Sequence, residues 1–321
     1  MITLAQSREG RADKVEQQVI ETFMRESEVL EMLPFDDAVS PNGGSTMIYG
    51  YVQTKLPSQA AYRAIGSEYT PNEATVEKQT VELAIFGGSF EIDRVIKTIE
   101  GQLNNMNFQL EQKIKAAVAL FHDGMINGDT ASDANSFDGL DKMLTGTTSE
   151  YNADGSYDIS TKATLEANAS DVYEQILMLI NRTGANALLC NEQLKSKIQT
   201  IARVLGYKTE SEEAFGRVVT TIGENKVRLI DLKNKVTVAD GKAVEAPIIP
   251  VAEGLTDLYA VKFDVNDGVC GVSLTGDNII NTYLPDFSTP NAVKKGEVEM
   301  IACIALKNSK SAGVLRNIKV S

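Results

Sequence analysis

Histidine and the common catalytic motifs are scarce in this sequence. There is one histidine, His122, among 321 residues, although histidine is the side chain that most often serves as a general base. The sequence contains neither the nucleophile elbow G-x-S-x-G, nor the phosphate-binding G-x-x-x-x-G-K-[ST], nor the zinc-binding H-E-x-x-H. We therefore expect no catalytic site. We expect His122 to be an ordinary residue on a helix surface or at an interface.

Cysteine is also rare. The three cysteines, Cys190, Cys270 and Cys303, stand far apart and form no C-x-x-C pair. An odd, scattered set fits neither a disulfide framework nor a zinc site. The sequence therefore predicts buried free thiols in a reducing compartment.

Long hydrophobic runs are missing. The N-terminus has no apolar run of the kind found in signal peptides. No stretch approaches the roughly 18 consecutive apolar residues of a membrane-spanning helix. We expect a protein that works where it is made, or that leaves only by lysis.

Clusters of positive charge are lacking as well. The formal net charge is -13, and the densest basic pair in the C-terminal half is Lys294-Lys295. This balance argues against a reader of nucleic acid, which would carry a basic face. It still permits a protein that lies near DNA without adhering to it. The hydrophobic content of 43% allows a sizeable core, and the length allows two domains.

A long apolar periodicity is the most informative feature that is present. Apolar side chains recur every three or four residues between Ile92 and Ile126, which places them on one stripe of a helix. These residues are Ile92, Ile96, Ile99, Leu103, Met106, Leu110, Ile114, Ala117, Phe121 and Met125. The pattern predicts one helix of roughly 50 Å, which is typical of a mechanical part more than of a reaction centre.

Glycine-containing segments flank this predicted helix. Gly87-Gly88 precedes it without the spacing G-x-G-x-x-G, so we interpret the pair as a hinge and not as a phosphate cradle. The loop that follows carries Asp129, Asp133, Asp138 and Asp141. Their spacing does not match a calcium loop. We therefore favour a solvated turn with capping aspartates over a cation site.

The N-terminal part predicts a helix followed by a projecting hairpin. The helix spans Asp13 to Leu33 and ends at Pro34. Alternating strands run from Ser45 and return from Ala74 to Phe86, around a polar tip from Leu56 to Pro71. Because a lone two-stranded ribbon is marginal in water, its edges and tip should find partners on another subunit. A hairpin folded onto its own domain is the alternative.

The remaining sequence predicts a compact α/β unit with further strands. A helix at Ser170–Arg182, a strand at Ala187–Cys190 and a helix at Glu192–Leu205 follow one another, with Asn191 as N-cap and Gly206 as terminator. Further strand-like runs are 218–232, 246–251, 258–263 and 300–306. The fold class is therefore α+β.

In the order of these parts, the chain resembles the major capsid protein of tailed bacteriophages, the Hong Kong 97-type fold, which encapsulins share. The resemblance rests on the hairpin tip from Ala61 to Tyr69, the segment Gly87 to Arg94, and Phe137-Asp138-Gly139-Leu140. It implies an N-terminal arm (1–44), an extended hairpin loop (45–88), a peripheral domain with a spine helix (89–140 and 258–321) and an axial domain (141–257).

The resemblance implies a structural function with no enzyme activity, cofactor or metal. Subunits would form pentamers and hexamers that close into an icosahedral shell around double-stranded DNA, without membrane contact. The shell would belong to a virion assembled in the host bacterial cytoplasm, with a separate scaffolding protein and a portal as partners. The alternatives are an encapsulin-type nanocompartment and, from another class, a soluble α/β enzyme with an acidic metal site.

The resemblance points to the hairpin for intersubunit contacts. The candidate residues are Leu56, Tyr62, Arg63, Glu68 and Tyr69. Some relatives crosslink subunits through a hairpin lysine. Lys55 and Lys78 lie in this hairpin, but no local feature indicates activation, so we do not extend that chemistry to them.

Overall fold

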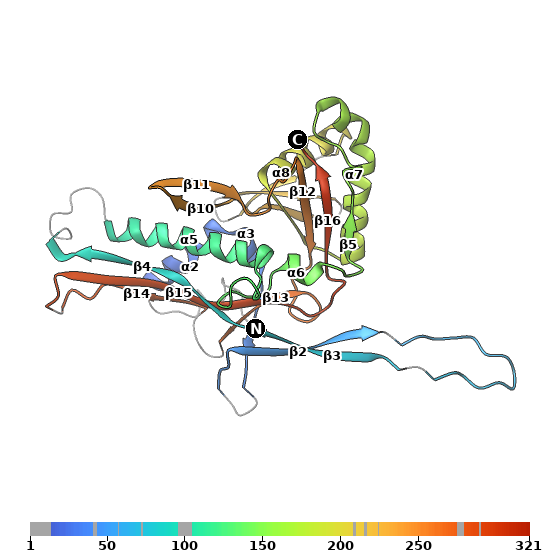
Figure 1. Ribbon diagram of the computed structural model, residues 1–321, viewed down its shortest axis with the longest axis horizontal. Coiled ribbons are helices and arrows are strands. Elements are labelled where there is room, and N and C mark those ends of the chain that lie inside the picture. Colours follow the sequence, from blue (N-terminus) through green and yellow to red (C-terminus); the bar gives the residue numbers. More distant parts are fainter. Residues whose placement is uncertain are drawn as a thin grey trace.

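The structure is a computed structural model. It describes residues 14–40, 44–56, 58–71, 73–95, 105–207, 210–214, 217–223, 225–274, 279–288 and 290–321. These residues form two larger sheets, two two-stranded hairpins and the helices that pack on the sheets (Figure 1). Within the described ranges, no helix is long and apolar enough to cross a membrane.

A five-stranded sheet is built around one long strand, β15. It pairs antiparallel with β13, β14 and β4, and β1 adds to β13 in parallel. The strands are β1 (Phe35–Ala38), β4 (Ala84–Asp93), β13 (Val269–Leu274), β14 (Ile280–Tyr283) and β15 (Val293–Leu306). Phe86, Phe90 and Ile92 alternate with exposed residues along β4, so one face of this sheet joins the main core.

Helix α5 (Asn105–Asn127) lies along that buried face. The prediction of one helix from Ile92 was wrong at its start, because Ile92 belongs to strand β4. Ile96, Ile99 and Leu103 lie outside the described residues. From Leu110 onward the predicted stripe is buried as expected.

The hinge predicted at Gly87-Gly88 is also wrong. Both glycines lie inside β4 and pair with Glu299 and Val298 of β15. A Cβ atom at Gly87 would collide with the carbonyl oxygen of Val298. This close approach of two backbones, and not a bend, is what requires glycine here.

The predicted N-terminal helix is divided in two. Helix α2 (Lys14–Glu26) and helix α3 (Glu28–Met32) are separated by Ser27, whose side chain caps α3 by accepting a hydrogen bond from the N–H of Leu30 at 3.0 Å. Helix α2 packs against α5. The break at Ser27 arises because a serine side chain competes with the backbone for hydrogen bonds.

A seven-stranded sheet forms the second large unit, in the order β5-β16-β12-β6-β9-β8-β7. Its strands are β5 (Glu150–Asn152), β6 (Ala187–Cys190), β7 (Glu210–Ala214), β8 (Arg217–Ile222), β9 (Val227–Asp231), β12 (Leu255–Val261) and β16 (Ala312–Lys319). Helices α7 (Lys162–Thr183) and α8 (Glu192–Val204) pack on it. The predicted strand β6 is confirmed to the residue, and Asn191 caps α8 by accepting a hydrogen bond from Leu194 N.

Strand β6 separates two cores. Leu188 and Cys190 point into the cluster formed with α7 and α8, whereas Ala187 and Leu189 join the cluster that contains α5. Burial on both faces explains the uninterrupted apolar run in the sequence. All three cysteines are free and buried, as predicted.

Strands β12 and β16 belong to this seven-stranded sheet, whereas β13 and β15 lie in the sheet beside α5. The segment 258–321 therefore contributes to both sheets. The division of the chain into an arm, a hairpin, a peripheral domain and an axial domain remains a proposal.

Arg316 of β16 ties the two units together. It forms ion pairs with Asp141 of helix α6 (Leu140–Leu144), with Glu150 of β5 and with Asp257 of β12. Its side chain is 17% exposed. Three carboxylates that converge on one arginine fix the point where the chain passes from α5 into the α/β unit.

Two hairpins project from these sheets. Strands β2 (Ile48–Leu56) and β3 (Thr75–Glu82) form the longer hairpin, and β10 (Asn234–Ala239) and β11 (Lys242–Pro247) form a ribbon near α5. The single returning strand predicted from Ala74 to Phe86 is interrupted at Leu83. The two parts differ because β3 pairs with β2, whereas β4 pairs with β15.

Candidate intersubunit surfaces

The base of the long hairpin is anchored by charged and aromatic groups. Tyr49 donates a hydrogen bond to Asp36 at 2.6 Å, and Lys307 binds the same carboxylate at 2.8 Å. Further out, Gln53 donates to the carbonyl of Leu306 at 3.3 Å. The hairpin is thus fixed to β1 and to the end of β15.

These contacts change the acidity of the groups involved. Burial and the hydrogen bond to Asp36 raise the pKa of Tyr49 to about 12. Burial alone would raise the pKa of Asp36, but the hydrogen bonds from Lys307 and Tyr49 outweigh it and lower that pKa. The anchor is therefore a carboxylate, an ammonium and a neutral phenol at neutral pH.

The hairpin face turned away from this anchor carries three exposed apolar side chains among polar ones, which include Lys78, Thr80 and Glu82. Directly opposed residues of an antiparallel pair share a face, so Ile48, Val52 and Val76 lie together on one side. They are 51%, 63% and 64% exposed. These three exposed β-branched side chains are candidates for contact with another subunit.

The tip of the hairpin contains a hydrogen-bonded turn. The N–H of Ser67 bonds to the carbonyl of Ala64 at 3.2 Å, and Gly66 has a φ of 88°. The positive φ at the third position is typical of a type II turn and favours glycine. Ile65 therefore stands at the apex of the turn, where it is fully exposed.

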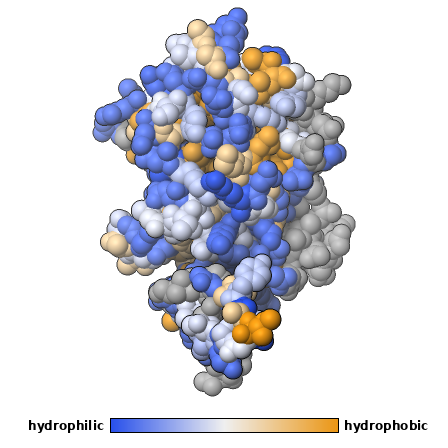
Figure 2. All heavy atoms as spheres, turned by 90° about the vertical axis from the view of Figure 1, so that its right-hand side faces the viewer, coloured by the Kyte–Doolittle hydropathy of each residue, from blue (hydrophilic) through white to orange (hydrophobic). Residues whose placement is uncertain are grey.

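Arg63 stabilises this turn. Its guanidinium donates to the carbonyl of Ser67 at 3.1 Å and lies over the ring of Tyr69 at 5.3 Å. Tyr62 points into solvent and is fully exposed. Figure 2, which looks onto the end of the hairpin, shows apolar side chains standing out there among polar ones.

The predicted contact residues are therefore only partly brought together. Arg63 and Tyr69 interact, Tyr62 and Glu68 are exposed separately, and the side chain of Leu56, at the end of β2, lies outside the described residues. Their role between subunits remains a prediction. Sequence reasoning missed Ile65, although the Gly66 that follows it could have indicated a turn apex.

The acidic loop is organised around a lysine. Lys142 Nζ binds Asp129 at 2.6 Å and Asp138 at 2.8 Å. The hydrogen bond from Lys142 lowers the pKa of Asp129 to about 2. Asp141 is turned instead toward Arg316. An ammonium thus lies between two of the four carboxylates that the calcium alternative would have used.

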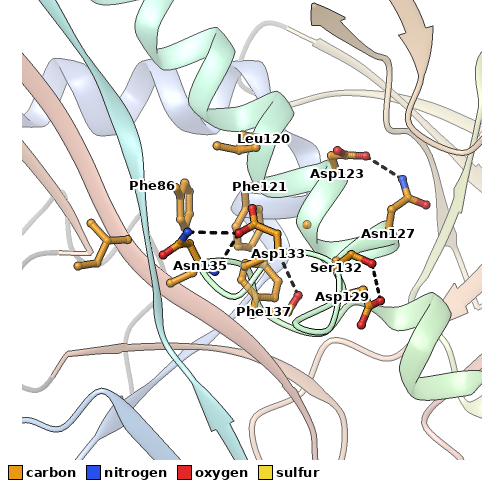
Figure 3. Close-up of a pocket in the computed structure, with 15 residues that line it drawn as sticks. Phe86, Leu120, Phe121, Asp123, Asn127, Asp129, Ser132, Asp133, Asn135 and Phe137 are labelled. Carbon is orange, nitrogen blue, oxygen red and sulfur yellow. Dashed lines mark hydrogen bonds between the residues drawn. The ribbon is translucent and has the colours of Figure 1, made fainter.

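A cavity of about 360 Å³ lies between this loop, the end of α5 and the start of β4 (Figure 3). Phe121 forms its floor together with Phe86 and Phe137, with ring centroids 5.7 and 6.1 Å apart. Leu120 and Ile85 line it and are 53% and 59% exposed. Sequence reasoning did not find this cavity, because its walls come from three separate segments.

The charged side chains that line this cavity are all aspartates: Asp123, Asp129 and Asp133. Asp123 also binds Lys235, and Asp129 binds Lys142. Asp133 accepts hydrogen bonds from the backbone N–H and the amide of Asn135, at 2.9 and 3.3 Å. Asp133 is exposed, and it forms no ion pair within the described part of the chain.

His122 is buried, which corrects the expectation of a surface or interface residue. Its Nε2 lies 2.7 Å from Ser27 Oγ, and its Nδ1 lies 3.4 Å from the carbonyl oxygen of Leu232. Because a carbonyl only accepts, Nδ1 carries the proton and Nε2 accepts from the hydroxyl. Burial lowers the pKa of His122 to about 4. This serine–histidine pair joins α3 to α5. Ser27 is 0% exposed, so a substrate in solution cannot reach its hydroxyl.

Comparisons with known proteins agree on the fold. No family model matches the sequence, and no curated protein matches it significantly. Many solved structures are similar, and three of them illustrate a similarity over nearly the whole chain. The SrpI encapsulin from Synechococcus elongatus has a TM-score of 0.60 at 13% identity, covering 92% of this chain and 88% of its own. The capsid of a native GTA particle has a TM-score of 0.56 at 9% identity, covering 93% and 90%.

The third structure, from Mycobacterium phage Bobi, has a TM-score of 0.53 at 11% identity and covers 90% of each chain. These similarities show that the chain has the Hong Kong 97-type fold, shared by phage capsid proteins and encapsulins. The predicted α+β fold class is therefore confirmed.

Proposed function

We propose that this protein is the repeating subunit of a closed icosahedral shell, and that the shell is the capsid of a tailed phage. The fold supports a shell, because the similar structures are named as capsids and an encapsulin. The subunits would form pentamers and hexamers. A separate scaffolding protein and a portal would be their partners in the host cytoplasm.

The observation that carries the shell proposal is the long hairpin. Its base is fixed by Asp36, Tyr49 and Lys307, whereas the apex residues Tyr62 and Ile65 are fully exposed. A monomer gains nothing from holding apolar side chains on a rigid projection, since burial is what makes apolar surface favourable. Contact with a neighbouring subunit supplies that burial.

The contents of the shell distinguish two candidates. The net charge of -13 suits an inner wall that must not adhere to packaged DNA, which supports the phage capsid. The similarity to the SrpI encapsulin supports a nanocompartment that holds protein cargo. We propose the capsid first. We place no catalytic chemistry in either candidate.

Negative-stain electron microscopy after size-exclusion chromatography tests the shell proposal. The expressed protein, with and without a candidate scaffolding partner, should form shells, tubes or rings of five or six. A variant that lacks residues 56–71 should remain folded but fail to assemble. A small discrete oligomer under every condition would contradict the proposal and favour the soluble-enzyme class. Shells from the natural source that contain DNA support the capsid, and shells that contain an enzyme support the encapsulin.

A further inference from the structure

We propose that the α/β unit binds a neutral adenine nucleoside in a pocket between helix α7 and the turn that joins β8 to β9. This inference goes beyond the proposed shell function and does not depend on it. The class of ligand follows from the aromatic rings, the charge and the hydrogen-bonding groups that line the pocket.

The pocket has a volume of about 420 Å³, which lies within the ~300–1,000 Å³ of ligand sites. Helix α7 contributes Tyr173, Leu177 and Asn181, which stand on one side of the helix because four residues separate each from the next. The β8–β9 turn contributes Ile222 and Asn225 to the opposite wall. A small molecule therefore fits between the helix and the turn.

Two stacked tyrosines line this pocket. The ring centroids of Tyr173 and Tyr207 lie 5.0 Å apart, and the angle between the ring planes is 15°. Tyr173 is 7% exposed, whereas Tyr207 is 56% exposed. The outer ring thus keeps an open surface on which a further planar ring can stack, as bases do on aromatic side chains.

The end of helix α8 holds Tyr207 in this position. Gly206 has a φ of 77°, and its N–H bonds to the carbonyl of Arg203 at 3.2 Å. The N–H of Tyr207 bonds to the carbonyl of Ala202 at 2.9 Å. These two bonds form a Schellman motif, which ends α8 and places Tyr207 against α7. Because the stacked pair exists before a ligand arrives, less conformational entropy is lost on binding.

The charge of the pocket favours a neutral ligand. Among the described residues, no charged side chain lines it. An ammonium ligand would find no carboxylate there, and a phosphate would find no cation. The chain also carries a net charge of -13, which opposes a nucleic-acid strand. A free nucleoside therefore suits the pocket better than a nucleotide or a base within a strand.

Two amide side chains indicate which planar ring fits. Asn181 and Asn225 are both exposed, and neither side chain forms a hydrogen bond with another described residue. Each amide offers an N–H donor beside a carbonyl acceptor. Adenine presents the matching acceptor and donor at N7 and N6, an edge to which asparagine forms two hydrogen bonds. An adenine ring that stacks on Tyr207 can direct this edge toward an amide.

Ligand-observed saturation-transfer NMR and isothermal titration calorimetry test the proposal on the full chain, in both assembled and unassembled fractions. Adenosine should bind, and AMP and a short oligodeoxyadenylate should bind more weakly. Tyr207→Ala should weaken adenosine binding by about tenfold or more, because it removes the stacking surface. Tyr207→Phe keeps the ring and should bind normally. Tyr283→Ala is the matched control, because Tyr283 is 54% exposed in β14 and does not line the pocket.

A second variant tests the amides without removing a ring. Asn181→Asp combined with Asn225→Asp replaces both amides by carboxylates, which cannot donate. This double variant should bind adenosine more weakly than the wild-type chain does. Circular dichroism of each variant distinguishes a lost contact from a lost fold, and the double variant decides the question if Tyr207→Ala unfolds.

Three results would overturn the proposal. The first is a wild-type chain that does not bind adenosine. The second is adenosine binding that Tyr207→Ala, or the double variant, leaves unchanged. The third is tighter binding of AMP or of the oligodeoxyadenylate than of adenosine. None of these results bears on the shell function, which electron microscopy tests separately.

Discussion

Because the chain has a single histidine, the effect of histidine protonation on its stability can be predicted for one side chain, His122. His122 is buried and neutral in the folded chain, with a pKa lowered from 6.5 to about 4. In the unfolded chain its pKa should return to about 6.5. Between these values the unfolded state binds the extra proton, so acidification should favour unfolding.

The magnitude follows from the two pKa values. At pH 7 the protonation of His122 lowers the free energy of unfolding by almost nothing, because this side chain is mostly neutral in both the folded and the unfolded state. At pH 5 the unfolded histidine is nearly all protonated and the folded one hardly at all. The free energy of unfolding should therefore fall by about 2 kcal/mol between pH 7 and pH 5 through this residue alone.

Urea unfolding followed by circular dichroism measures this change. The variant lacking residues 56–71 is the suitable background, because shell disassembly would otherwise mix with subunit unfolding. His122→Gln in that background keeps a donor and an acceptor but does not titrate. Subtracting the pH dependence of the free energy of unfolding of one chain from that of the other removes the contribution of the carboxylates, which both chains share.

Two results would refute the reasoning. One is an equal pH dependence in the two chains. The other is a proton NMR titration of the single imidazole with a pKa at or above 6.5. Either would mean that His122 is exposed or charged in the folded state, and the link between α3, α5 and Leu232 would be wrong.

Three further substitutions, two of them with a matched control substitution, probe the fold through urea unfolding in the same background. Leu110→Asp puts a charge on the buried side of α5 and should cost about 4 kcal/mol or more, whereas Leu120→Asp, on the exposed side, should cost less than about 1. An unchanged Leu110→Asp curve would contradict the assignment of that face. Arg316→Met leaves three carboxylates without their shared partner and should cost about 3 kcal/mol. Arg182→Met loses only a contact with an aromatic ring and should lower the free energy of unfolding by about 1 kcal/mol at most. Equal losses in the Arg316 and Arg182 variants would contradict the role of Arg316 in linking the two units. Tyr49→Phe removes one hydrogen bond at the hairpin anchor and should cost about 1–2 kcal/mol, and no loss would mean that the anchor does not hold the base.

Local chemistry made some elements predictable. Strand β6 is a short apolar run between turn residues, and Asn191 has the side chain that caps a helix, so both follow from a few neighbouring residues. The turn at Gly66 is equally local. The order of these parts was enough to predict the fold class.

The predictions that proved wrong concern features that depend on contacts between residues far apart in the sequence. The predicted helix began too early because the spacing of four between Ile92 and Ile96 suits a helix and also a strand. Only the pairing of Ile92 with Lys294 of β15, some two hundred residues later, places Ile92 in a strand. His122 lies 95 residues from Ser27 and 110 from Leu232 along the chain, so its burial has no local signature. The cavity could not be predicted either, because residues from separate segments of the sequence line it.

The antiparallel ladder between β4 and β15 has a mechanical consequence. β3 continues into β4 through Leu83, so tension applied at the hairpin tip travels along the chain into β4. There it meets the ladder from Ala84 to Asp93, which pairs with β15 from Ala302 to Val293. The force loads these hydrogen bonds in shear, all at once, and does not peel them one after another. A subunit pulled by its neighbour should therefore yield at the contact between subunits before its own sheet opens.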